Sequence, residues 1–350
     1  MNSLERIRNS IARKKTDMTA VAPYMGNHGA AAAGVKLYDY YTKAEKMFEA
    51  QAGAWEKYRQ DVMVMQSDNY YIAEGFGTEV TYYENSTPTF LKPAIKSIAE
   101  VGGLKIPDPW SDGRMHVYLE AIGMAARAYG SEIAIRGCGT GPFSLAGHIV
   151  GTQDFLLEIA QAGHDEASSN KAAVLELMEL TTEALLRFDI AQLQAGAHIV
   201  ICGDSLASID MISPDMYREY VLPYEKKLFA SLKQYTEKYG GYSLLHICGN
   251  NTKILNEIAS TGADIFEVDY KVDLKLCREK LPEKMCIMGN INPVTLLTGS
   301  EAEVERAALD CLEAAGSGEG FILGTGCEVA IDTPPENMQR MIQTARSYKR

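Results

Sequence analysis

The chain has 350 residues, of which 46% are hydrophobic, and its 46 acidic residues outnumber its 34 basic residues by 12. This composition is typical of a soluble protein with a large core. The acidic surplus argues against binding to nucleic acid or to an anionic membrane, because both require clustered Lys and Arg. No stretch of the sequence approaches the roughly 20 apolar residues of a membrane-spanning helix.

The seven cysteines are odd in number and spread along the chain. This pattern is typical of a reducing compartment and not of a disulfide framework, so we expect a cytoplasmic protein whose thiols bind metal, react or pack. Residues 1–15 are basic and amphipathic, with Leu4, Ile7 and Ile11 on one face. No apolar signal-peptide core follows them, so they are expected to form a helical extension.

Short apolar runs alternate with longer segments of helical period, which predicts repeated βα units and a parallel sheet. The runs expected to be strands are Thr19–Tyr24, Asp61–Met65, Glu132–Arg136, His198–Cys202, Tyr242–His246, Asp264–Val268, Met285–Met288 and Gly320–Leu323. The clearest expected helices, several of which begin at a Ser, Asp or Asn cap, are Asp165–Gln194, Pro214–Tyr239, Asn251–Ser260, Ser300–Ala315 and Pro335–Tyr348.

Eight strands with interposed helices predict an α/β fold, a single (β/α)8 TIM barrel over residues 1–350 with the N-terminal helical extension. Residues 66–93 are expected to be an insertion after the second strand, in which Thr78–Tyr83 forms a β-hairpin arm. An open, doubly wound sheet is the alternative. It is disfavoured because no Gly-x-Gly-x-x-Gly motif follows any of the runs.

In a barrel, the active site forms from the loops that follow the strands. The polar residues at these positions are therefore the candidates for chemistry. They include Asn27 and His28 after the first strand, Arg136 at the end of the third, Asp204 after the fourth, and Asn290 and Asn292 after the seventh.

His246 and Cys248 are two residues apart at the end of the fifth strand, so their side chains project to the same side. Cys327 follows the last strand, which can face the fifth across the barrel mouth. One imidazole and two thiolates suit Zn²⁺ and leave its fourth position open. Glu267 or Asp269 could fill that position. The alternative is that these cysteines and the histidine are ordinary packed residues.

Motifs spread over most of the chain carry a resemblance to a known family. They are Gly141-Pro142-Phe143-Ser144-Leu145-Ala146, Gly203-Asp204-Ser205, the run from Ser213 to Tyr224, His246-Ile247-Cys248-Gly249, Gly289-Asn290-Ile291-Asn292-Pro293, Gly326-Cys327-Glu328 and the run from Asp332 to Asn337. In this order they resemble the uroporphyrinogen decarboxylase superfamily, and within it the zinc-dependent corrinoid methyltransferases.

Departures from the decarboxylase pattern favour the methyltransferase branch. The porphyrinogen decarboxylases carry arginines after the first strand to bind a polycarboxylate, whereas residues 22–28 contain none. The resemblance implies that His246, Cys248 and Cys327 bind zinc. It also places an acidic ligand about twenty residues after the first cysteine, which favours Asp269, with Glu267 as its rival.

The resemblance further implies methyl transfer between a small methylated substrate and the cobalt of a corrinoid. The corrinoid must sit on a separate protein, because the chain has no Asp-x-His-x-x-Gly motif. Zinc would activate a methoxy oxygen as a Lewis acid or, in the reverse direction, hold a thiol such as coenzyme M as the thiolate. A decarboxylase and a noncatalytic corrinoid-binding barrel are the remaining alternatives, and a homodimer is compatible with all of them.

The aromatic residues of the insertion favour a phenyl methyl ether as substrate, although they could equally pack the insertion on the barrel. The sulfonate of coenzyme M would need a basic partner, for which Arg136 is the main candidate. We expect His28 to be a proton donor to the leaving oxygen and Asp204 to be catalytic. The candidates for substrate or corrinoid contacts are Tyr24, Asn27, Arg136, Asn290 and Asn292.

Overall fold

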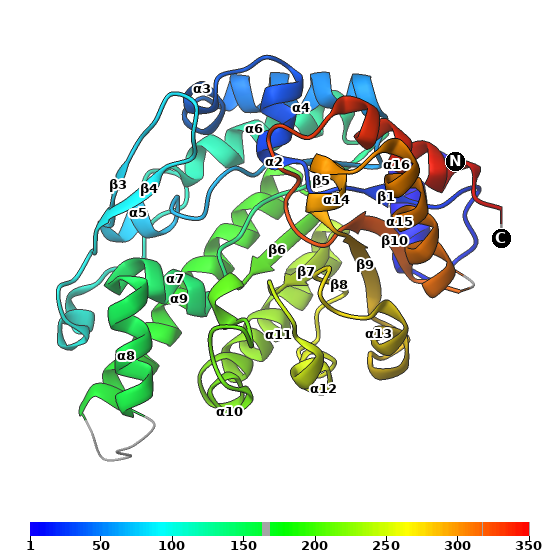
Figure 1. The fold of residues 1–350 in the computed structure, drawn as a ribbon. Coiled ribbons are helices and arrows are strands. Elements are labelled where there is room, and N and C mark those ends of the chain that lie inside the picture. The colour runs from blue at the N-terminus through cyan, green and yellow to red at the C-terminus, as the bar shows by residue number, and fades with distance from the viewer. Residues whose placement is uncertain (163–168, 317, 350) are drawn as a thin grey trace.

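The computed structural model describes residues 1–162, 169–316 and 318–349. Its main sheet has eight strands in the order β1-β10-β9-β8-β7-β6-β5-β2, with parallel pairing throughout (Figure 1). The strands are β1 (Val21–Ala22), β2 (Val62–Val64), β5 (Ala134–Arg136), β6 (Ile199–Gly203), β7 (Tyr242–His246), β8 (Ile265–Glu267), β9 (Cys286–Ile291) and β10 (Phe321–Thr325). Each predicted run overlaps one of them.

The two end strands of this sheet meet and nearly close the barrel. The backbone N–H of Asp61 donates to the carbonyl of Val21 over 2.8 Å, and the Asp61 carboxylate accepts the N–H of Val21 over 2.8 Å. Arg6 and Arg346 bind the same carboxylate. The (β/α)8 prediction is confirmed, and the doubly wound alternative is wrong because that sheet would keep two separate edges.

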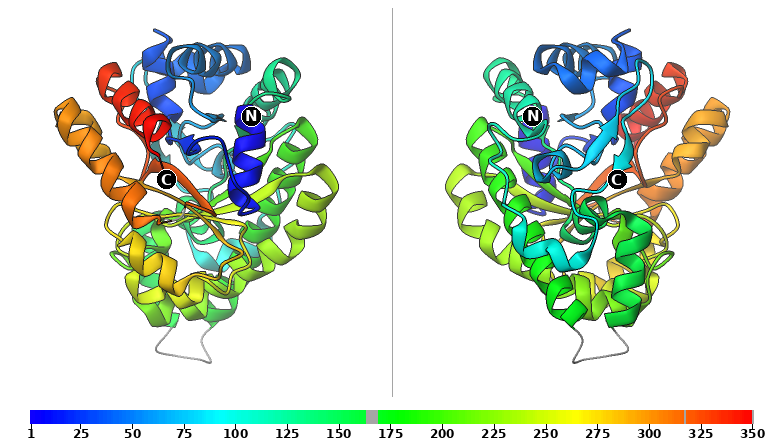
Figure 2. Two further views of the ribbon diagram at one scale, coloured as in Figure 1. Left: turned by 90° about the vertical axis from the view of Figure 1, so that its right-hand side faces the viewer. Right: turned by 90° about the vertical axis from the view of Figure 1, so that its left-hand side faces the viewer.

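Helices surround the strands, as Figure 1 and Figure 2 show from three sides. They are α1 (Ser3–Ile11), α2 (Gly26–Ala32), α3 (Leu37–Thr42), α4 (Ala44–Tyr58), α5 (Ala73–Phe76), α6 (Met115–Tyr129), α7 (Pro142–Val150), α8 (Thr152–Ala162), α9 (Ser169–Ala195), α10 (Pro214–Met216), α11 (Leu222–Tyr239), α12 (Leu255–Ile258), α13 (Leu274–Lys280), α14 (Pro293–Thr298), α15 (Glu301–Ala314) and α16 (Pro335–Ser347). Among the described residues, no helix is both long enough and apolar enough to cross a membrane.

Most of the predicted helices are present with small shifts in their ends. The helix expected over Pro214–Tyr239 runs through α10 and α11, with π-helical residues Tyr217–Val221 between them. The helix expected over Asn251–Ser260 is shorter, a 3₁₀ turn followed by the four residues of α12. The start expected at Asp165 lies outside the described residues. Ser300 caps α15 in a capping box with Glu303.

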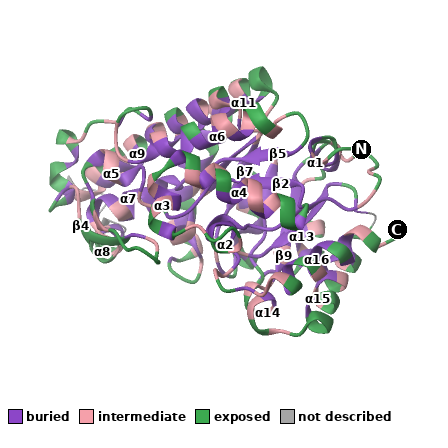
Figure 3. Ribbon diagram, turned by 90° about the horizontal axis from the view of Figure 1, so that it is seen from above, coloured by how far each residue is buried: buried purple, intermediate pink, exposed green. Residues whose placement is uncertain are grey.

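The barrel interior is filled by alternate strand residues, and α1 covers its amino-terminal end. Leu4, Ile7 and Ile11 are buried against the inward side chains of the strands, which confirms the amphipathic face expected for this segment. Figure 2 (left) looks at this end of the barrel, with the dark blue α1 lying across it. In Figure 3 the strands are largely buried, while the outer helices carry exposed outward faces. Any reaction site is therefore expected at the opposite, carboxyl end.

A two-stranded hairpin, β3 (Glu79–Thr81) with β4 (Thr89–Lys92), lies between β2 and α6 in the chain. The Tyr41 hydroxyl donates to the carbonyl of Tyr83 over 2.7 Å, which ties the hairpin to α3. The aromatic residues of this segment divide into two groups. Tyr71 and Phe76 are buried in the core, whereas Tyr82, Tyr83 and Phe90 remain exposed.

Candidate metal centre

Three soft ligand atoms converge at the carboxyl end of the barrel. His246 is the last residue of β7, Cys248 follows two residues later, and Cys327 follows β10. The Nε2 atom of His246 lies 3.4 Å from the Cys248 sulfur, which lies 3.9 Å from the Cys327 sulfur. Ligand atoms of all three residues lie within 4.8 Å of one another. The expected meeting of the fifth and eighth strand ends is therefore present in the structure.

These separations match those of a tetrahedral zinc site. With bonds of about 2.3 Å to sulfur and about 2.0 Å to nitrogen, tetrahedral zinc holds its ligand atoms about 3.5–3.8 Å apart. The nitrogen-to-sulfur and sulfur-to-sulfur distances both fall close to this range. The residues present thus fit the ion, both in atom type and in spacing.

The orientation of the His246 ring also suits metal binding. Its Nδ1 atom lies 3.1 Å from the backbone carbonyl of Glu267 and 3.4 Å from the Glu267 carboxylate. A partner on Nδ1 fixes the ring and turns Nε2 toward the two sulfurs, as in metal sites whose histidines are held by a carbonyl or a carboxylate. The side chain of Leu244 points into the barrel, and His246, two residues later on the same strand, points to the same side because side chains alternate along a strand.

A buried ion pair holds Glu267 in place beside His246. Arg136, at the end of β5, donates to both oxygens of Glu267 over 2.6 and 2.9 Å, and both side chains are almost fully buried. The Arg136 guanidinium also lies 4.6 Å from the centre of the Tyr24 ring. The pair connects β5 to β8 across the barrel and holds Glu267 beside His246.

The two thiols and the imidazole interact strongly. The hydrogen bond with Cys327, together with the neighbouring His246, lowers the pKa of Cys248 well below its usual range, while the same contact raises the pKa of Cys327 far above its usual range. Burial lowers the pKa of His246, but the Cys248 thiolate outweighs it and raises that pKa to about 9. A bound cation would allow both thiols to ionise together, because it would compensate their combined charge.

Neither acidic residue predicted as a fourth ligand belongs to this group. Glu267 is held by Arg136. Asp269 accepts the backbone N–H groups of Gly249 and Lys271, each over 2.8 Å, and so shapes the two loops. Both carboxylates therefore have hydrogen-bond donors of their own in the structure, and the role of either as the fourth ligand stays a prediction.

The two expected catalytic residues are both hydrogen-bonded within the fold. His28 is buried, with Nδ1 3.1 Å from the Ile331 carbonyl and Nε2 3.0 Å from the Tyr58 hydroxyl. Asp204 is fully buried and accepts hydrogen bonds from the backbone of Phe143 and from Ser144, which anchors the start of α7. Both side chains thus have partners in the structure, and their catalytic roles stay predictions.

The expected contact residues also divide. Asn290 donates to the carbonyls of Asp269 and Val272, and Asn292 caps α14, so both organise loops instead of offering free groups. Arg136 is committed to Glu267 and cannot offer its guanidinium freely to a sulfonate. Tyr24 contacts Arg136 through its ring, and the side-chain amide of Asn27 donates to Glu328, the residue after Cys327.

Two neighbours of the centre were not among the predicted site residues. Cys248 donates to the Ser205 hydroxyl over 3.4 Å. Glu328, next to Cys327, accepts both the backbone N–H and the side-chain amide of Asn27 over 2.9 Å, and burial raises its pKa to about 7. Both residues lie within motifs quoted from the sequence, Ser205 next to Asp204 and Glu328 next to Cys327, and these positions could have identified them.

A second group, Cys202, Asp204 and Glu225, also lies within 4.8 Å. It is wholly buried, and burial raises the pKa of Glu225 to about 8. The Asp204 oxygens are already bound by α7, and Tyr217 donates to Glu225. Local contacts therefore engage both oxygens of Asp204 and one oxygen of Glu225.

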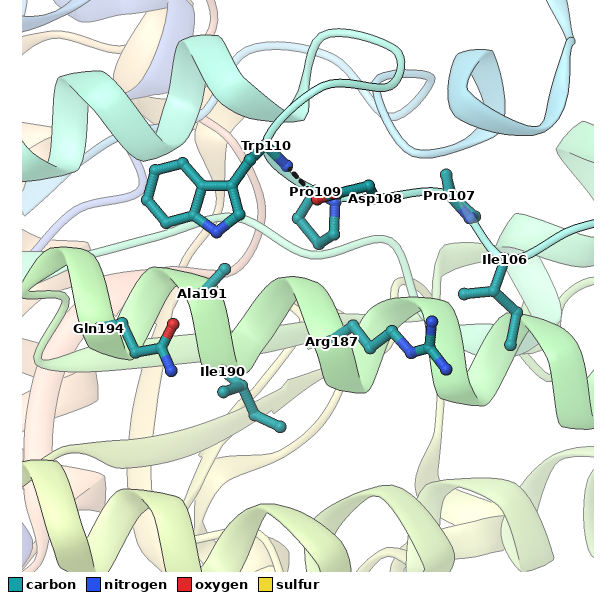
Figure 4. Close-up of a pocket in the computed structure, with 9 residues that line it drawn as sticks. All are labelled: Ile106, Pro107, Asp108, Pro109, Trp110, Arg187, Ile190, Ala191 and Gln194. Atoms are coloured by element: carbon teal, nitrogen blue, oxygen red, sulfur yellow. Dashed lines mark hydrogen bonds between the residues drawn. The ribbon is translucent and has the colours of Figure 1, made fainter.

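A surface cavity of about 320 Å³ lies elsewhere, between α9 and the loop before α6. Figure 4 shows Trp110 and the neighbouring prolines on one side and Arg187, Ile190 and Gln194 of α9 on the other. The cavity shares no lining residue with the metal centre, so a molecule bound in it would not contact the three ligands.

Comparisons with known proteins agree with the fold and show the family. The family model described as uroporphyrinogen decarboxylase (URO-D) matches residues 2–348. The methylcobamide:CoM methyltransferase MtbA of Methanosarcina acetivorans is 31% identical over 263 residues, which cover 75% of this chain and 72% of that protein. The methylated-thiol–coenzyme M methyltransferase of Methanosarcina mazei is 28% identical over 276 residues, covering 78% and 69%. A solved methyltransferase from Methanosarcina mazei has the same fold, with a TM-score of 0.86, 23% identity and coverage of 99% and 98%.

Proposed function

We propose that this chain, which belongs to the uroporphyrinogen decarboxylase (URO-D) family and, within it, to the corrinoid-dependent methyltransferases, is a zinc enzyme. It would move a methyl group from a methoxy substrate to the cobalt(I) of a separate corrinoid protein. The observation that carries the proposal is the convergence of one imidazole nitrogen and two sulfurs at the barrel mouth. This ligand set is that of a catalytic zinc site with an open position.

His246, Cys248 and Cys327 would hold the ion. When bound, zinc supplies Lewis acidity toward the oxygen from which the methyl group departs. Glu267 fixes the His246 ring through Nδ1, and Arg136 in turn fixes Glu267. Because Glu267 and Asp269 are engaged by other partners, the chain itself supplies three ligands and leaves room for the substrate.

A neutral methoxy substrate is favoured by the state of two buried arginines. Arg136 is paired with Glu267, and Arg114 is paired with both Asp68 and Glu74. Neither guanidinium is left unpaired to receive a sulfonate. The exposed tyrosines of the hairpin offer aromatic surface, so we propose phenyl methyl ethers as the first substrate class.

Methylation of a thiol is the second candidate function. It is supported by the relatives, several of which carry coenzyme M in their names. In that direction the same three ligands would serve to hold the acceptor sulfur near zinc as the thiolate. The two functions share the metal centre and differ in which small molecule occupies it.

Metal analysis combined with a transfer assay tests the proposed function. Protein purified without chelator is expected to contain about one zinc ion per chain. Added to methoxybenzene and cob(I)alamin, it should produce methylcobalamin, as followed by absorbance, and lose this activity on treatment with a chelator. Protein without metal, or transfer that survives metal removal, would contradict the proposal. Activity only from methylcobalamin to a thiol would favour the second candidate.

The supporting role of Glu267 leads to a separate prediction. Glu267→Gln should weaken zinc binding by about 10–100-fold, because it removes the carboxylate that holds His246 and balances Arg136. Asp269→Asn should weaken zinc binding less, since its contacts are to loop backbone. Competition with a fluorescent zinc chelator measures both affinities. A larger loss in Asp269→Asn would restore Asp269 as the fourth ligand.

A further inference from the structure

We propose that the surface cavity between α9 and the loop before α6 binds an aromatic carboxylate, a small molecule with one flat ring and one acidic group. The ring would stack on Trp110, and the acidic group would bind Arg187. The cavity shares no lining residue with the metal centre. A ligand bound there would therefore be additional to the substrate of the proposed methyl transfer.

Trp110 presents an exposed indole on one wall of the cavity. It is 52% exposed, although tryptophan is usually well buried. The other tryptophan, Trp55, packs its ring against Tyr129 and Arg59. Among the residues that the structure describes, no aromatic ring or cation stacks on the indole of Trp110. Its face is therefore available to stack on the ring of a bound molecule.

The loop that carries Trp110 is held in one shape. Pro107 and Pro109 each fix one of its backbone angles. The Asp108 carboxylate accepts the backbone N–H of Trp110 over 2.9 Å, the bond that is dashed in Figure 4. The backbone N–H of Asp108 in turn donates to the Asp112 carboxylate over 2.8 Å. Such a preorganised wall loses little conformational freedom when a ligand binds, which favours binding.

The opposite wall is one face of α9. Arg187, Ala191 and Gln194 are four and three residues apart, so they lie on the same side of the helix. Figure 4 shows the indole of Trp110 above Ala191 and Gln194, and Arg187 farther along the helix, toward Ile106. The cavity volume of about 320 Å³ is at the small end of the range for ligand pockets. It suits a molecule with a single ring.

Arg187 gives the cavity its preference for an acidic group. Its Nε atom donates to Glu183 over 2.8 Å, in a surface pair that solvent screens. In the described part of the chain, its two terminal nitrogens have no hydrogen-bond or ion-pair partner. These N–H groups can donate to both oxygens of a carboxylate. Asp108, the one acidic residue among the described residues that line the cavity, is already bonded to Trp110.

Trp110 also reports on binding, because the chain has only two tryptophans. Benzoate, benzyl alcohol and benzylamine have the same ring and carry a negative, a neutral and a positive group. Each is added to the purified protein while its tryptophan fluorescence is recorded. Benzoate should quench this fluorescence and saturate below about 10 mM. The other two compounds should bind at least about 10-fold more weakly, because neither can pair with a guanidinium.

Three variants locate the bound molecule. Arg187→Gln should weaken benzoate binding by about 10-fold, because it removes the charge and keeps a helix-forming side chain. Trp110→Phe should abolish the quenching, because only Trp55 then emits. Arg306→Gln is the matched control, since Arg306 forms the same kind of pair, with Asp310 on α15, and does not line the cavity. It should bind benzoate as the parent protein does.

Several results would overturn the proposed site. They are the absence of saturable quenching by benzoate, binding of benzyl alcohol or benzylamine as tight as that of benzoate, and quenching that persists in Trp110→Phe. An unchanged affinity in Arg187→Gln, or an equal loss in Arg306→Gln, would also overturn it. None of these measurements uses zinc or methyl transfer. A negative result therefore leaves the proposed function standing, and a failed zinc analysis leaves this site standing.

Discussion

Replacing Cys327 with serine is expected to remove most of the bound zinc and to lower methyl transfer by at least about 100-fold, a loss at the upper end of those caused by changing residues that only support metal ligands. Cys327 is the one ligand of the three that comes from β10, on the far side of the mouth from β7. Without it, His246 and Cys248 are left as a two-ligand site, which holds zinc poorly. Zinc content by atomic absorption and the rate of methylcobalamin formation measure the two effects.

Cys311→Ser is the matched control for this prediction. Cys311 lies on α15, and its thiol donates to Asn290 over 3.7 Å, a bond that a serine hydroxyl can replace. This variant should keep both its zinc and its activity. If Cys327→Ser retained a full equivalent of zinc and normal transfer, the three-ligand centre would be wrong.

Replacing Asp61 with alanine is expected to lower the free energy of unfolding by about 3–5 kcal/mol, the usual effect of removing one partner from a buried ion pair. Asp61 is fully buried and joins four parts of the chain. Its carboxylate binds Arg6 of α1 and Arg346 of α16 and accepts the N–H of Val21 in β1, while Asp61 itself precedes β2. The variant leaves two guanidinium groups and the seam of the barrel without this acceptor. Urea unfolding followed by circular dichroism measures the loss.

Asp17→Asn is the control that separates the effect of burial on stability from the effect of pairing with Arg6. Asp17 binds the same Arg6 over 2.9 Å, but its side chain is 34% exposed. Solvent screens such a pair, so this variant should lose about 1 kcal/mol or less. Equal losses of unfolding free energy in the two variants would show that the buried Asp61 carboxylate stabilises the protein no more than the partly exposed Asp17 does.

Regular patterns allowed much of the fold and the centre to be predicted. Apolar runs separated by helical segments predicted all eight strands of the barrel, because a buried parallel strand requires such a run. The two-residue spacing of His246 and Cys248 placed both at the same strand end, and a barrel allows Cys327 to face them across the mouth, as the structure shows. The apolar face of residues 1–15 likewise predicted α1.

The choice among acidic and polar residues could not be made in the same way. Glu267 ends β8 and Asp269 lies two residues later, and the spacing implied by the family resemblance favoured Asp269. The structure instead engages Asp269 with loop backbone and Glu267 with Arg136, a residue that is 131 positions away in the chain. His28, Asp204 and Asn290 also have the pattern of free groups at strand ends, and only their distant partners show that they are engaged.

The sequence by itself determined which chemistry is available, namely a barrel whose strand ends carry one imidazole and two thiols, because residue type and strand period are local properties. Only the tertiary structure decided which of the other polar groups are already satisfied. Hydrogen bonds and ion pairs between residues far apart in the chain depend on how the strands close into a barrel. That closure engaged Arg136 with Glu267, and His28 with Tyr58 and Ile331.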